Sequence, residues 1–330
     1  MICGSYPPDV CGIGDYTAEL VKALKQHGTA VEPLPRRRWN LLDSQRIVKE
    51  IRRSGCDIVH LQYPSEGYRT SLVPQWVSMQ VPLVVTIHDF LNSRIERRLA
   101  CIPFFLFAKR LVFTTRYELD GVARLFPWIR RKSVVIPIGT NIPADSTSRA
   151  RSFDEILYFG LLAPHKGLEQ VLKLAEMALA DGLNLRVHIV GTFPPRLRAY
   201  AEDLMASARN LPVRWTLGKS PLEVSRILAS SSVAFMPFPD GASERRGSLK
   251  AAVSAGVVCI TTAGSQTPED MLRAVVVIDT VEEAYERAKI LMGDVDQWKR
   301  LSTEATNYAR TFDWEAIAYA HRELYMSQQA

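Results

Sequence analysis

Arg245 and Arg246 lie between a short apolar run and the start of a helical run. This change of pattern predicts a strand, a loop and a helix in that order. The first N–H groups of a helix and its dipole attract anions, and two guanidinium groups add charge that suits a phosphate. The segment therefore predicts a phosphate site, to which Gly247, Ser248 and Leu249 would add backbone N–H groups.

Four further residues could serve the same chemistry. Lys166 begins a helical run after a strand, where its charge could meet a diphosphate or point into solvent. His88 ends an apolar strand beside Asp89, which could orient its ring. It could hydrogen-bond a sugar or stabilise charge on a leaving phosphate, or it could be a structural histidine. Gly12 and Gly14 would allow close backbone approach to a ligand, or form a tight turn.

Length and composition favour two intracellular α/β domains. The chain has 330 residues, of which 47% are hydrophobic, and a net charge of +6. This modest excess favours anionic ligands or an anionic surface. The five cysteines show no metal-ligand spacing, which indicates reduced thiols in the cytoplasm. We see no signal peptide and no apolar run of about 18 residues that could span a membrane.

Apolar runs alternate with amphipathic ones, which is typical of parallel β-sheet with helices between the strands. Strands are expected at 2–4, 57–61, 83–87, 110–113 and 133–136, and after a restart at 155–159, 185–190, 213–216, 233–236, 257–260 and 275–278. Helices are expected at 16–26, 42–53, 168–181, 196–208, 221–229, 248–255, 281–292 and 314–327, with Asp15 as the N-cap of the first. The first strand is short because the chain starts almost inside it.

The expected fold is α/β, with two doubly wound, Rossmann-like parallel-sheet domains facing a cleft. The first domain would cover residues 1–145, with the helix 313–330 packing back on it, and the second residues 151–312. Proline, glycine and polar residues at 137–152 predict the linker. Ligands in such folds bind at the carboxyl ends of the strands.

Several motifs in this order resemble the GT-B glycosyltransferases, specifically the retaining family 4. The resemblance covers nearly the whole chain. It rests on segments 11–17, 86–89, 135–140, 159–167, 216–218, 236–238 and 312–314.

The resemblance implies that the second domain binds a nucleotide-sugar donor and the first domain an acceptor. Lys166, Arg245, Arg246 and the N–H groups of residues 247–249 would stabilise the departing diphosphate. Gly12 and Gly14 would also contact the donor. It implies a front-side mechanism with retention, in which the leaving phosphate helps to take the acceptor proton. No cofactor and no divalent metal are expected, because the nucleotide sugar is a co-substrate.

The sequence departs from the family pattern at the donor site. Leu161 stands where the family has a phosphate-binding arginine, so Arg245 and Arg246 could replace its charge. Two glutamates eight residues apart correspond to Ser243 and Ala251 here. Ser243 remains a donor-binding candidate, and Glu244, one residue away, could take the catalytic place of the first glutamate.

We therefore predict a glycosyltransferase that moves a sugar to a hydroxyl acceptor in bacterial polysaccharide, glycolipid or related glycan biosynthesis. A non-catalytic sugar-nucleotide-binding protein is the main alternative, because the glutamates are missing. A nucleotide-sugar epimerase or a phosphorylase-like enzyme could share the fold. The charge would suit nucleic acid, but no dedicated motif supports such a partner.

Two basic segments raise the question of membrane contact. Arg36–Arg38 precede a tryptophan, and Arg94–Arg110 contain Phe104, Phe105 and Phe107. They could bind the surface of an anionic membrane that presents a lipid-linked acceptor, or they could be solvated faces. The first interpretation predicts a cytoplasmic protein peripheral to the inner face of the cytoplasmic membrane.

Overall fold

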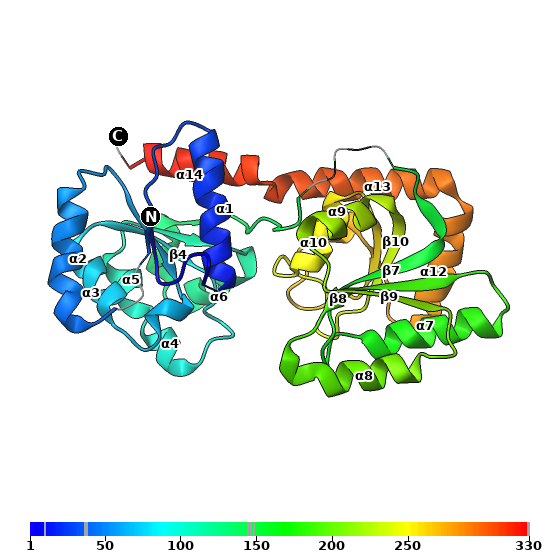
Figure 1. Ribbon diagram of the computed structural model, residues 1–330. Coiled ribbons are helices and arrows are strands. Elements are labelled where there is room, and N and C mark those ends of the chain that lie inside the picture. Colours follow the sequence, from blue (N-terminus) through cyan, green and yellow to red (C-terminus); the bar gives the residue numbers. More distant parts are fainter. Residues whose placement is uncertain (10, 36–38, 144, 146, 148, 329–330) are drawn as a thin grey trace. The chain divides into compact units, whose positions relative to one another are not determined.

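The computed structural model (Figure 1) describes residues 1–9, 11–35, 39–143, 145, 147 and 149–328. The chain forms two compact units, Met1–Gly139 with Phe312–Ala330 and Thr140–Thr311. Each unit contains a six-stranded parallel sheet with helices on both faces. The expected fold class, two Rossmann-like α/β domains, is confirmed.

In the first unit the strand order is β2-β1-β3-β4-β5-β6. The strands are β1 (Ile2–Cys3), β2 (Leu34–Pro35), β3 (Val59–Tyr63), β4 (Leu83–Ile87), β5 (Arg110–Phe113) and β6 (Ser133–Val135). The helices are α1 (Gly12–Gln26), α2 (Leu41–Arg53), α3 (Val73–Gln80), α4 (Ile95–Leu99), α5 (Ile102–Phe107), α6 (Arg116–Leu125) and α14 (Trp314–Met326), with 3-10 turns at Glu66–Tyr68 and Pro127–Lys132.

The first sheet is buried on both faces, which is why its central strands are continuous apolar runs rather than alternating ones. Every residue of β4 is buried. Side chains of α2, α3, α5 and α6 cover one face. Helices α1 and α14 cover the other face, although they come from opposite ends of the chain (Figure 1).

In the second unit the strand order is β12-β11-β10-β7-β8-β9. The strands are β7 (Ser152–Leu161), β8 (Arg186–Thr192), β9 (Val213–Leu217), β10 (Ser231–Met236), β11 (Val258–Thr261) and β12 (Val276–Val277). The helices are α7 (Leu168–Ala180), α8 (Arg198–Ser207), α9 (Pro221–Ser230), α10 (Gly247–Ser254), α11 (Met271–Ala274), α12 (Val281–Gly293) and α13 (Val295–Ala309), with 3-10 turns at Pro195–Leu197 and Arg310–Phe312.

Two expectations about helices were wrong. Helix α1 begins at Gly12 with Cys11 as its N-cap, so Asp15 lies within the first turn and is not the cap. There its carboxylate faces the positive end of the helix dipole. In the second unit, helices α11 and α13 were not expected. Helix α13 does carry the apolar stripe of an amphipathic helix, which is formed by Val295, Trp298, Leu301, Ala305 and Ala309 at intervals of three or four residues. Trp298 and Leu301 pack against the core, and Ala305 and Ala309 are buried.

Among the described residues, no helix combines the length and the apolar character that crossing a membrane requires.

Candidate functional site

A cavity of about 440 Å³ opens at the carboxyl ends of the strands of the second unit. Binding sites for small molecules are commonly of this size and in this position. The lining comes from the ends of β7 and β8, from the residues after β9 and β10, and from the first turn of α10. Its members are Ile142, Tyr158–Leu161, Lys166, Gly191, Thr192, Lys219, Pro221, Val224, Phe238 and Arg245–Ser248.

Four cationic side chains line this cavity: Lys166, Lys219, Arg245 and Arg246. No carboxylate occurs among the described residues that line it. The Nζ of Lys219 lies 2.9 Å from a carboxylate oxygen of Glu223, and each side chain is 43% exposed. The cavity is therefore suited to a ligand that carries more than one negative charge.

Arg246 is held in place from two sides. Its guanidinium carbon lies 4.7 Å from the centre of the Phe238 ring, which is a cation–π contact. Its Nη2 forms an ion pair with Asp240, whose side chain is mostly exposed. The Nε atom is buried and has no hydrogen-bond partner. Arg246 thus keeps one unpaired donor.

The first turn of α10 reaches the cavity, as the sequence predicts. Gly247 and Ser248 line it, and the first N–H groups of an α-helix have no intrahelical acceptor. A Cβ atom on Gly247 would meet nothing within 4 Å, so nothing in the protein requires a glycine there. Ser243 and Leu249 are buried and are not among the lining residues. The donor-binding role of Ser243 stays a prediction, and Leu249 could contribute only its backbone to anion binding.

The loop that carries Lys166 packs tightly against the loop after β10. Gly167, the N-cap of α7, has a φ of +77°, and a Cβ there would lie 2.0 Å from the carbonyl oxygen of Pro237. Glycine is therefore required by both backbone angle and space. The hydroxyl of Tyr158 on β7 donates to the carbonyl of Leu161. These contacts bring Lys166 to the same cavity as the two arginines.

Glu244 is half-buried and does not line the cavity. Its charge acts instead on Lys250, a side chain of α10 that is 1% exposed. Burial lowers the pKa of Lys250 to about 8, and the carboxylate of Glu244 opposes that shift. The catalytic role expected of Glu244 stays a prediction.

In the first unit, Gly12 and Gly14 open helix α1. A Cβ on Gly14 would lie 2.9 Å from the carbonyl oxygen of Ser5, so the fold itself requires this glycine. Gly12 is exposed, and a Cβ there would meet nothing within 4 Å. Its backbone is accessible to a ligand.

His88 directly follows β4, and its backbone N–H donates to the carbonyl of Tyr63. Its Nε2 lies 2.8 Å from Oε1 of Gln62, so Gln62 orients the ring. The Tyr16 ring packs edge-on at a centroid distance of 5.0 Å. His88 keeps part of its surface exposed, yet burial of the ring lowers its pKa to about 3, with a smaller contribution from His321. The side chain is neutral at pH 7.

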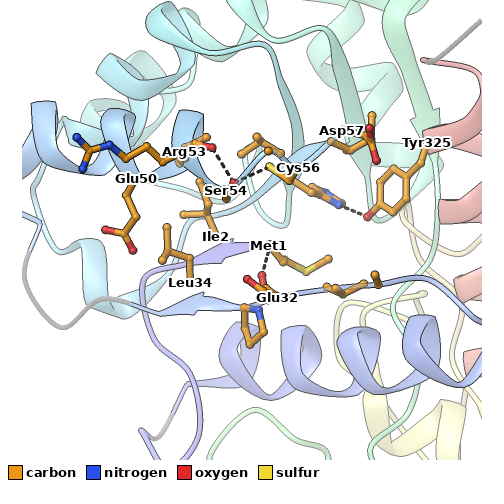
Figure 2. Close-up of a pocket in the computed structure, with 18 of the residues that line it drawn as sticks. Met1, Ile2, Glu32, Leu34, Glu50, Arg53, Ser54, Cys56, Asp57 and Tyr325 are labelled. Carbon is orange, nitrogen blue, oxygen red and sulfur yellow. Dashed lines mark hydrogen bonds between the residues drawn. The ribbon is translucent and has the colours of Figure 1, made fainter.

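A larger cavity, of about 1370 Å³, lies in the first unit (Figure 2). It is lined by the residues at and before the starts of β1, β2 and β3, and by α2 and the end of α14. Met1 and Glu32 are among the lining residues, and the terminal amino group of Met1 donates to the carbonyl of Glu32. Because doubly wound folds bind ligands at the opposite, carboxyl ends of the strands, the smaller cavity is the stronger candidate site.

The membrane-contact prediction for the two basic segments can be compared with the structure for only one of them. Arg36–Arg38 lie outside the described residues. Phe104 and Phe105 are fully buried in the core, so their expected availability to a membrane was wrong. Ile95, Leu99, Leu106 and Phe107 are instead more than half exposed. Among the described residues, no group of three or more His, Cys, Asp or Glu side chains is placed to hold a metal ion.

Comparison with known proteins agrees with this geometry. Residues 24–142, about a third of the chain, match the model of Glycosyltransferase Family 4. A search of the curated proteins finds no match.

Solved structures match more of the chain. A glycosyltransferase from Rickettsia africae has a TM-score of 0.75 and 15% identity, over 99% of this chain and 97% of its own. Anabaena HepE, in complex with UDP and glucose, has a TM-score of 0.66 and 16% identity, over 99% and 98%. The fold is GT-B. The pneumococcal O-GlcNAc transferase GtfA, with UDP and GlcNAc, has a TM-score of 0.60 and 13% identity, over 77% of this chain and 54% of its own.

The prediction of the GT-B fold is confirmed. The match of residues 24–142 to Glycosyltransferase Family 4 agrees with the prediction of a glycosyltransferase. The structure brings Lys166, Arg245, Arg246, Gly247 and Ser248 to one cavity of this fold.

The sequence analysis did not identify two residues of the candidate sites, Lys219 at the cavity and Gln62 beside His88. Lys219 lies on an exposed loop, where only its place after the segment 216–218 gave a signal. Gln62 sits two residues after His60 on β3. Polar side chains at alternate positions of a buried strand indicate that both face the same side of the sheet and hydrogen-bond there.

Proposed function

We propose that this chain transfers a sugar from a nucleotide-sugar donor to a hydroxyl group of a glycan or lipid-linked acceptor. The observation that carries the proposal is the cavity of the second unit. There, four cations and the N-terminus of α10 converge at the carboxyl ends of the strands. The chain resembles HepE and GtfA in fold, and both structures hold UDP with a sugar.

The donor's diphosphate would occupy this cavity. Lys166, Arg245 and Arg246 would pair with its oxygens, and the N–H groups of Gly247 and Ser248 would bind it through the backbone. Charge grows on the diphosphate as the bond to the sugar breaks. Fixed cations and dipoles at that point stabilise the transition state more than the ground state.

The reaction would proceed with retention at the anomeric carbon. The bond from that carbon to the phosphate oxygen breaks, and a bond to the acceptor oxygen forms on the same face. The acceptor proton passes to the departing diphosphate, so no carboxylate pair is needed. This route fits a cavity without a lining carboxylate among the described residues.

His88 would act on this reaction as a neutral hydrogen-bonding group. Burial lowers its pKa to about 3, which disfavours the cationic form that could stabilise phosphate charge. A hydrogen bond to a sugar hydroxyl is the role that remains for it.

An acceptor held in a membrane would explain the exposed apolar side chains of α4 and α5. Ile95 and Leu99 are one helical turn apart on α4 and are 62% and 56% exposed. Arg94 and Arg97 are exposed beside them. Apolar residues flanked by arginines suit the interface of an anionic bilayer.

Calorimetric titration with UDP, ADP and GDP, and with their glucose and N-acetylglucosamine derivatives, tests the donor assignment. Lys166→Ala should weaken the best ligand on the order of tenfold, because a charged hydrogen bond contributes about 1.5–3 kcal/mol. The matched control is Lys289→Ala on α12, whose Nζ lies 2.8 Å from Glu286. No binding by any of these ligands, or equal loss in both variants, would contradict the proposal.

The stereochemical part has its own test. Once the titration has identified a donor that binds, NMR of the first-formed glycoside gives the configuration at the anomeric carbon of the product. Retention is expected, and inversion would exclude the same-face route while leaving the donor site intact.

A further inference from the structure

A row of polar side chains crosses the layer between the first sheet and helices α1 and α14. His60 and Gln62 lie two residues apart on β3, and Thr86 is the register partner of Gln62 on β4. His88 follows Thr86 by two residues, and alternate residues of a strand face the same side. Tyr325 on α14 completes the row.

The distances link these groups into a continuous chain. Nε2 of His88 lies 2.8 Å from Oε1 of Gln62, and Nε2 of Gln62 lies 3.4 Å from Nε2 of His60. Nδ1 of His60 lies 2.6 Å from the hydroxyl of Tyr325, and its Nε2 lies 2.8 Å from Oγ1 of Thr86. These distances alone would fit two opposite proton arrangements, because an amide can be turned and an imidazole nitrogen can donate or accept.

Met1 distinguishes the two arrangements. Nε2 of Gln62 lies 3.7 Å from the thioether sulfur of Met1, which carries no proton and can only accept. The amide nitrogen of Gln62 therefore faces Met1 and His60, and its oxygen faces His88. Since that oxygen can only accept, the Nε2 of His88 must carry the proton.

The same reasoning assigns the opposite tautomer to His60. Its Nε2 accepts from Gln62 and Thr86, so its proton lies on Nδ1 and is donated to Tyr325, which is labelled in Figure 2. Two neighbouring histidines thus hold their protons on different nitrogens, which is a signature that can be measured.

We propose that Gln62 is a positioning residue that fixes the proton of His88 on Nε2, so that Nδ1 accepts a hydrogen bond from a hydroxyl group of the substrate. The contacts of the His88 ring with the described residues are made by Nε2, which meets Gln62, and by the ring itself, which packs against Tyr16. The role at the substrate rests on the proposed function. The tautomer rests on the contacts of Gln62 alone.

The surroundings favour a neutral ring. The groups facing His88 are the Tyr16 ring from α1, His60 from β3 and His321 from α14, with Asp89 next in the chain. Burial is the largest cause of its lowered pKa, and His321 adds to it. A neutral imidazole has one donor and one acceptor, so fixing the donor defines the acceptor.

The experiment is a two-bond ¹H–¹⁵N correlation spectrum of the full chain labelled at its six histidines. Signals of His88 and His60 are assigned by His88→Asn and His60→Gln. At pH 7 we expect His88 with its proton on Nε2 and His60 with its proton on Nδ1. His88 protonated on Nδ1, or as an even mixture of tautomers, would overturn the proposal.

Two variants of Gln62 separate positioning from packing. Gln62→Leu removes the acceptor, so the His88 signals should shift toward a mixture of tautomers. Gln62→Glu keeps an acceptor for the Nε2 proton, so the tautomer should be preserved and His88 should titrate at higher pH than in the native protein. Unchanged His88 signals in Gln62→Leu would contradict the proposal. His188, held by Thr216 in the other unit, is the internal control and should not change.

Turnover of UDP-glucose and UDP-N-acetylglucosamine tests the second part of the proposal, the hydrogen bond between His88 and the substrate. Gln62→Leu should lower kcat on the order of tenfold with little change in KM, and Gln62→Glu should restore much of it above the titration of His88. The tautomer is read without substrate. A correct tautomer without turnover of either donor would therefore contradict the proposed function and leave the positioning role intact.

Discussion

At the residue scale, Arg246 shares its charge between Asp240 and the cavity. Its ion pair with Asp240 is at the rim, because the aspartate side chain is 69% exposed. A phosphate would compete with that carboxylate for the same guanidinium. The two partners should therefore have opposite effects on ligand affinity when each is removed.

We expect Arg246→Ala to weaken UDP binding on the order of tenfold, and Asp240→Asn to strengthen it a few-fold at low salt, because a repelling charge is removed. Titration calorimetry at two salt concentrations measures both. Weaker binding in Asp240→Asn would mean that the aspartate serves mainly to orient Arg246.

A substitution at Gly247 should have opposite effects on the stability of the protein and on its affinity for UDP. Gly247 is exposed and an added Cβ would meet nothing within 4 Å, so Gly247→Ala should stabilise the protein by about 0.5 kcal/mol. The added methyl group should nevertheless keep a phosphate from the backbone and lower affinity for UDP. Gly293→Ala, at the exposed end of α12, is the control that should affect stability alone. Equal UDP affinity in both variants would argue against a phosphate at this turn.

At the element scale, the sequence predicted the central buried strands more closely than the helices around them. The strands at 83–87 and 110–113 have the expected bounds because buried parallel strands are continuous apolar runs. Helix α13 was missed although Val295, Trp298 and Leu301 recur at helical spacing, because most of its other side chains are polar. Lys219 was missed because one lysine on an exposed loop carries no pattern, and only the fold brings it to the cavity.

The layer between the first sheet and α14 should make stability depend on pH. Burial lowers the pKa of His88 to about 3 and of His321 to about 4, and lowers that of His60 well below 6.5. Below about pH 6.5 the unfolded chain therefore binds protons that the folded chain does not.

The free energy of unfolding should consequently fall as the pH drops from 6.5 toward 4. Each fully unprotonated histidine contributes a slope of up to about 1.4 kcal/mol per pH unit. Urea unfolding at pH 7, 6 and 5 measures this slope, and it should be smaller in His321→Gln. The exposed His165 supplies the control, His165→Gln. An identical slope in His321→Gln would show that this histidine does not set the pH dependence.

At the scale of the whole molecule, each unit carries part of the proposed chemistry: the cationic cavity in the second, and His88 and the exposed side chains of α4 in the first. The composition, with its modest positive charge, fits both an anionic ligand and an anionic surface. Measuring the binding of the protein to lipid vesicles tests whether it also binds an anionic membrane surface.

We expect the protein to bind vesicles containing phosphatidylglycerol and to be released by salt, because each basic residue near such a surface contributes about 1 kcal/mol that salt screens. Ile95→Ser with Leu99→Ser should weaken this binding. Leu179→Ser with Leu222→Ser, at exposed positions of the second unit, should not. Equal binding to neutral and anionic vesicles would contradict an electrostatic membrane contact.

The central claim is that a nucleotide diphosphate binds where α10 begins. Hydrogen exchange of the full chain, with and without saturating UDP, tests the location directly. We predict slower exchange of the amides of Gly247–Leu249 and of the loop at 160–167, because the phosphates would accept from the first group and pack against the second. Saturating UDP that leaves these amides unchanged, or that protects amides of the first unit alone, would contradict the account.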